Sequence, residues 1–149
     1  MTKKSSREFI DTMQEWFDKA PALPKNVRQA LVNITPWIAL IFGILGILGG
    51  IAGLGLLTVF APFAMFGGAS GITGYGTGFL AEIIWLVASI LLLAAFPGTK
   101  ARKLGGWTLL FWSEVLHLVG SLVAFSFISG IIGAVIAFYL LFQIKPYYK

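Results

Sequence analysis

Charged residues are absent from a long stretch in the first half of the chain. None occurs from Gln29 to Ala81, and leucine, isoleucine, phenylalanine, alanine and glycine fill most of this interval. One helical crossing of the hydrocarbon core of a bilayer needs about 20 apolar residues, so the interval predicts at least one membrane span. Thr35 followed by Pro36 suits the first turn of a helix. We therefore place the first span at about 36–58.

Turn-forming residues separate this span from the apolar runs that follow it. Pro62 and the glycines between Gly67 and Gly78 predict a break, so a long uncharged connection, mobile or re-entrant, is expected over 59–78. Three further spans are predicted at about 79–96, 104–125 and 129–144. The predicted fold is an all-α integral membrane protein, in which residues 34–149 form an antiparallel bundle of four transmembrane helices.

The amino-terminal segment, residues 1–33, has a different pattern. Apolar residues recur at helical spacing and share one helix face; they are Phe9, Ile10, Met13, Trp16 and Phe17. The pattern predicts an amphipathic helix on the cytoplasmic side. Such a helix lies on the membrane surface or packs on a protein surface, and the pattern fits both.

Composition and charge support the membrane assignment. Hydrophobic residues make up 58% of the chain and charged residues 11%, against about 25% charged in soluble domains. The eleven lysines and arginines flank the predicted spans, before the first, between the second and third, and after the fourth. By the positive-inside rule this places both termini in the cytoplasm, with the chain in the cell (plasma or inner) membrane. The expected partner is the lipid bilayer, and nucleic acid is not expected despite the net charge of +5.

The inventory of reactive residues argues against an enzyme. The chain has no cysteine and one histidine, which is too few for a zinc site of three or four His, Cys or carboxylate ligands. We therefore expect no catalytic residues, no metal and no cofactor.

Glycines predict close packing between helices. Small residues at spacings of three and four let another backbone approach in a membrane. The first span carries Gly43, Gly46, Gly49, Gly50 and Gly53, and the fourth offers Gly130 and Gly133. The pattern fits packing inside one bundle and also fits contact between copies or with other membrane-protein subunits.

Ionisable residues inside the third span are the main candidate site. Glu114 lies about 15 Å from the start of that span, close to the bilayer midplane, and His117 follows one turn later. Ser113 and Ser121 share this polar face, which should turn away from lipid. Glu82, near the outer end of the second span, could line one outward path with both.

Two interpretations of Glu114 and His117 stay open. In a structural clasp they bond to each other or to Ser89, Tyr139 or Gln143 on adjacent spans. In a proton-binding site they exchange protons with water. The first interpretation favours a non-enzymatic membrane protein of packing or assembly type. The alternative is a small proton-linked transporter or channel subunit.

Overall fold

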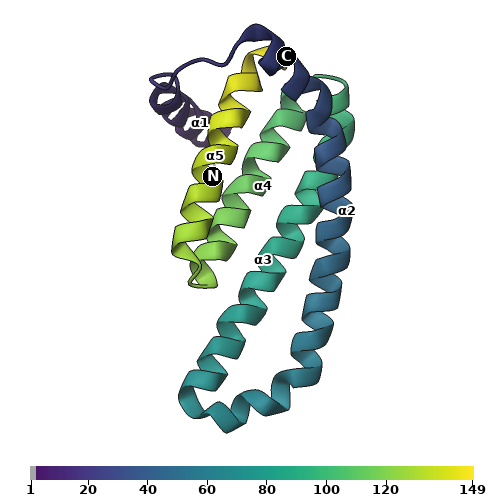
Figure 1. Cartoon of the computed structure of the whole chain (residues 1–149), viewed down its shortest axis with the longest axis vertical. Helices are drawn as coiled ribbons and strands as arrows, with labels where there is room; N and C mark the ends of the chain where they lie inside the picture. The colour runs from purple at the N-terminus through teal and green to yellow at the C-terminus, as the bar shows by residue number, and fades with distance from the viewer. Residues whose placement is uncertain (1–2) are drawn as a thin grey trace.

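The computed structural model describes residues 3–149, with side chains from Ser5 onward. Within this range every regular element is a helix, and the prediction of an all-α fold is confirmed. The long helices α2 to α5 run alternately up and down beside one another (Figure 1). The elements are α1 (Lys3–Phe17), α2 (Lys25–Ala64), η1 (Met65–Gly67), α3 (Gly68–Lys100), α4 (Leu104–Val123), α5 (Phe127–Ile144) and η2 (Lys145–Tyr147).

Three stretches of the structure are long and apolar enough to cross a membrane: Lys25–Lys100, Leu104–Val123 and Phe127–Tyr147. The first contains both α2 and α3, which form a helical hairpin closed by η1. Large apolar side chains point outward along these helices, as at Phe42 and Leu48, each 60% exposed. An outer surface of this kind is unfavourable in water and suits hydrocarbon, which is consistent with a membrane protein.

The predicted connection over 59–78 is wrong, because helix occupies most of it. α2 continues through Pro62 to Ala64, and α3 begins at Gly68. Only η1 reverses the chain, with Gly68 at φ +61°, a conformation that favours glycine. Proline and glycine are tolerated in apolar helices, so the residues that predicted a break instead lie within helix.

The prediction that a helix begins at Thr35 and Pro36 is also wrong. α2 begins at Lys25, directly after Pro24, and Pro36 lies inside the helix. The Thr35 hydroxyl donates to the Leu31 carbonyl one turn back, so it bonds within the helix and caps nothing.

The α2–α3 hairpin is much longer than the α4–α5 pair. With 40 residues α2 extends about 60 Å, and with 20 residues α4 extends about 30 Å. Ala124, just past the end of α4, shares a cavity with Gly53 of α2 and Gly78 of α3. Beyond that level the tip of the hairpin extends past the α4–α5 turn (Figure 1).

The aromatic core lies at the opposite end, where α1 packs on α4 and α5. Trp107 and Phe111 are buried there, and the Trp107 indole donates to the Leu141 carbonyl across 2.8 Å. Phe9 and Phe17 of α1 contact rings of this core, with centroids 6.1 Å from Phe111 and 5.4 Å from Phe142, respectively. The bundle thus covers part of the apolar face of α1, whereas Phe9 stays 46% exposed and Trp16 73% exposed.

Candidate functional site

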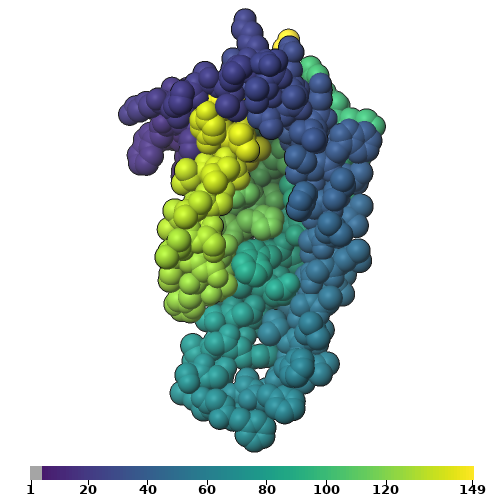
Figure 2. All heavy atoms as spheres, in the orientation of Figure 1, coloured from purple at the N-terminus to yellow at the C-terminus, as the bar shows by residue number. Residues whose placement is uncertain are grey.

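A lateral groove separates α2 from α5. Both helices pack on neighbours along the chain but barely touch each other. Figure 2 shows the resulting hollow between the blue α2 and the yellow-green α5, with atoms of α3 and α4 at its base. A cavity of about 730 Å³ occupies it, and a second of about 210 Å³ adjoins it toward α4. We call this feature the α2–α5 groove; its lining includes Ile38, Phe42 and Gly46 of α2, Ser89 of α3, Glu114 and His117 of α4, and Gly133 and Ala137 of α5.

Glu114 and His117 lie on α4 at the base of the α2–α5 groove and line both cavities. Helical spacing brings them to one side, as the sequence predicts. The Nδ1 atom of His117 lies 3.1 Å from the Ser113 carbonyl, which can only accept a hydrogen bond, so this nitrogen carries the proton. The Glu114 carboxylate makes no hydrogen bond or ion pair with any residue in the described part of the chain.

The polar side chains predicted to form the clasp are bonded to backbone groups instead. Ser89 donates to the Trp85 carbonyl, Tyr139 donates to the Pro21 carbonyl, and the Gln143 side-chain oxygen accepts from the Leu23 amide. The structure therefore does not form the hydrogen-bonded clasp from these residues. Glu114 is therefore without a hydrogen-bonding partner among the described residues.

Ser113 and Ser121 share the polar face of α4 but have structural partners. The buried Ser113 hydroxyl donates to the Ala88 carbonyl of α3 across 2.8 Å, which links the two helices. The Ser121 hydroxyl donates to the His117 carbonyl within α4. Both hydroxyl protons are therefore used within the bundle, and Ser113 also lines the deeper cavity.

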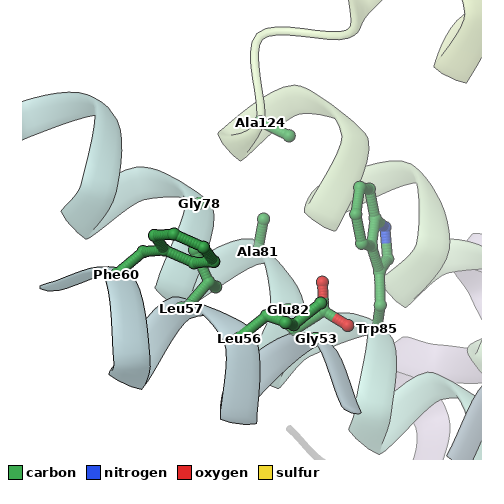
Figure 3. Close-up of a pocket in the computed structure, with 9 residues that line it drawn as sticks. All are labelled: Gly53, Leu56, Leu57, Phe60, Gly78, Ala81, Glu82, Trp85 and Ala124. Atoms are coloured by element: carbon green, nitrogen blue, oxygen red, sulfur yellow. The ribbon is translucent and has the colours of Figure 1, made fainter. Parts of the chain in front are cut away.

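Glu82 occupies a separate cavity of about 370 Å³ at the level of the α4 terminus (Figure 3). Its carboxylate lies against Gly53, where an added Cβ would be 2.6 Å from an oxygen. Trp85, one turn along α3, lines the same cavity and donates its indole N–H to the His117 carbonyl. Glu82 thus lines this cavity, whereas Glu114 lines the α2–α5 groove.

Most of the predicted packing glycines face α3. A Cβ added at Gly43 would lie 2.8 Å from backbone atoms of Leu93, and one at Gly50 would lie 2.9 Å from the Leu86 side chain. A Cβ added at Gly46 would clash with the Ser89 side chain, and one added at Gly53 would clash with the Glu82 side chain. This face of α2 therefore packs inside the hairpin.

The other glycines of the pattern have different surroundings. Gly130 of α5 packs against Ser121 of α4, whereas Gly49 and Gly133 have no atom within 4 Å of an added Cβ. The backbones of Gly98 and Gly106 also cross closely where α3 meets α4, a contact that the glycine pattern did not predict. Its only local signal is a glycine on each side of a short turn.

Comparisons with protein-family models, with curated proteins and with solved structures find no match to this chain. Function must therefore be argued from the site itself. An apolar groove with a carboxyl and an imidazole at its base has two chemical capacities: it can bind a group that donates hydrogen bonds, and it can exchange protons.

Proposed function

We propose that this chain is a non-enzymatic integral membrane protein whose helices α2, α3, α4 and α5 each cross the bilayer. Every lysine and arginine lies toward the same end of the alternating helices, which supports a cytoplasmic position for both termini. α1 then lies at the cytoplasmic interface of the cell membrane, with Trp16 toward lipid.

We further propose that the protein acts in assembly, by receiving a transmembrane helix of another protein in the α2–α5 groove. The observation that carries this proposal is the unpartnered Glu114 carboxyl at the base of a groove between two apolar helices. A carboxyl in hydrocarbon costs a few kcal/mol unless it faces protein or water. An entering helix that donates a hydrogen bond removes this cost.

The walls of the groove suit a helix as the occupant. Gly133 has open space around it, and Ala137 lies one turn further along α5. Small residues let a neighbouring backbone approach closely, which is the main source of helix association in membranes. Ile38 and Phe42 on the opposite wall provide apolar contact area.

The occupant we propose differs from this chain. A second copy would offer no cationic donor at this depth, because α4 and α5 contain no lysine or arginine. α2 has such residues only in its first turn, and α3 only at Lys100. The partner helix should therefore carry a lysine or arginine near its centre.

Site-specific photocrosslinking in native membranes tests this function. Phe42 and Leu48 lie on the same helix with equal exposure, but only Phe42 lines the groove. A photoreactive residue at position 42 should yield a discrete protein adduct that Glu114→Gln weakens, and position 48 should yield none. Equal adducts at both positions, or an adduct at 42 that Glu114→Gln leaves unchanged, would refute the assembly role.

Proton-linked transport is the second candidate, because Glu114 and His117 line the same cavities. Vesicles reconstituted with the purified protein would then show a pH-dependent flux that Glu114→Gln abolishes. Vesicles without such a flux would exclude transport by this chain alone and leave the assembly proposal intact.

A further inference from the structure

Another cavity, of about 400 Å³, lies where α1 crosses the start of α4 and the end of α5. Its apolar lining includes Ile10, Leu104 and Trp107. Arg7 and Lys145 add two positive charges, and Asp11 adds one negative charge. We call it the α1–α4 cavity. It combines an apolar wall with an excess of positive charge, and the proposed function does not use it.

Lys145 is held in a fixed position at this cavity. Its ammonium lies 3.5 Å from an Asp11 oxygen and 2.5 Å from the Gln14 side-chain oxygen. It also lies 5.3 Å from the centre of the Trp107 ring, a cation–π contact. Its side chain is only 18% exposed, so the charge is positioned before any ligand arrives.

Arg7 differs from Lys145 because its guanidinium has no partner within the described part of the chain. The residue is exposed and makes no hydrogen bond or ion pair among the residues that the structure describes. A guanidinium presents several N–H donors in a planar fork that matches two oxygens of a phosphate. Asp11 is 71% exposed, and its ion pair is with Lys145.

The position of the cavity along the bundle matches the headgroup layer of a membrane. Trp107 lies in the first turn of α4, and Lys145 directly follows α5. Tryptophan and lysine at the ends of spans mark the level of lipid headgroups. Basic pockets between helices at this level on the cytoplasmic side are suited to anionic lipids.

We propose that the α1–α4 cavity binds an anionic phospholipid, with its phosphate on Arg7 and Lys145 and an acyl chain along Ile10 and Leu104. The proposal rests on the membrane placement given above, but it does not depend on the α2–α5 groove. Failure of the crosslinking experiment would leave it standing, and its own failure would leave the assembly role standing.

Lipid binding to the purified full-length protein in detergent micelles tests the proposal. The midpoint of thermal unfolding is measured against increasing dihexanoyl phosphatidylglycerol, dihexanoyl phosphatidylcholine or inorganic phosphate. Phosphatidylglycerol should raise the midpoint most. Arg7→Gln should weaken the apparent affinity for it about fivefold, because one basic side chain near an anionic lipid surface contributes that much.

Lys19→Gln is the matched control, since it removes the same charge from an exposed position outside the cavity. Its lipid response should equal that of the unmodified protein. Three outcomes would overturn the proposal: equal responses to the two lipids, equal losses in Arg7→Gln and Lys19→Gln, or a response to inorganic phosphate as large as that to phosphatidylglycerol. The last would assign the site to free phosphate.

Discussion

The close approach of α2 and α3 can be tested at Gly43. Alanine there would place its Cβ 2.8 Å from the Cα and backbone nitrogen of Leu93. No change of side-chain rotamer relieves such a contact, because the opposing atoms belong to the backbone. Gly49 lies on the same helix with nothing within 4 Å of an added Cβ, so Gly49→Ala makes the same chemical change without the clash.

The expected magnitudes follow from this geometry. Carbon atoms pack at about 3.5–4.0 Å, so the two helices must separate by roughly 1 Å to admit the methyl group at position 43. Overpacking of this kind costs about 1–3 kcal/mol. Alanine in place of glycine favours a helix by up to about 1 kcal/mol at either position. Gly49→Ala should therefore match or exceed the stability of the unmodified protein, and Gly43→Ala should fall about 1–3 kcal/mol below Gly49→Ala.

Unfolding in mixed micelles provides the measurement. The fraction of sodium dodecyl sulfate is raised, and loss of tertiary structure is followed by the fluorescence of the five tryptophans. The comparison between the two variants cancels the shared effect of helix propensity. If Gly43→Ala unfolds at the same detergent fraction as Gly49→Ala, the two helices do not approach as closely as the structure has them.

Three further predictions use other parts of the molecule. Ser113→Ala removes a buried hydrogen bond between α4 and α3 and should cost about 0.6 kcal/mol in the same unfolding assay; Thr108→Ala, which removes a bond within α4 only, should cost less. Burial raises the pKa of the Tyr148 phenol above its ordinary value of 10.0, against the opposing effect of the Arg102 charge. The neutral phenol therefore stabilises the folded state below about pH 10, and this stability is lost as the pH rises further. In Tyr148→Phe the melting temperature should therefore fall less between pH 9 and 11 than in the unmodified protein. Single cysteines at Ser70 and Ala101 should react with a membrane-impermeant reagent from opposite sides of sealed vesicles, and reaction from one side would contradict four crossings.

The sequence predicted the parts of this structure that depend on neighbours along the chain. Apolar runs of helical length predicted an all-α fold, because hydrocarbon leaves backbone groups no partner except the helix itself. Glu114 and His117 were expected on one face of α4, since helical geometry alone brings residues three apart together. The apolar face of the amino-terminal segment was recognised from the same periodicity.

Helix ends and helix partners could not be predicted in this way. Pro62 and the glycines near it are strong breakers in water, but hydrocarbon penalises every unpaired backbone group and so favours a continuous helix. The glycines of α2 showed a face for close contact without showing that α3 would cover it. Tyr139 and Gln143 bond to Pro21 and Leu23, more than a hundred residues earlier in the chain.

At the candidate site, too, some features follow from one helix alone and others only from the tertiary structure. Which residues share the polar face of α4 is a property of one helix, and the sequence alone determined it. Whether Glu114 finds a partner depends on the positions of four helices at once, and only the tertiary structure decided that its carboxyl has none among the described residues at the base of the α2–α5 groove. The physical reason is that periodicity acts between neighbours in sequence, whereas packing and hydrogen bonding act between neighbours in space.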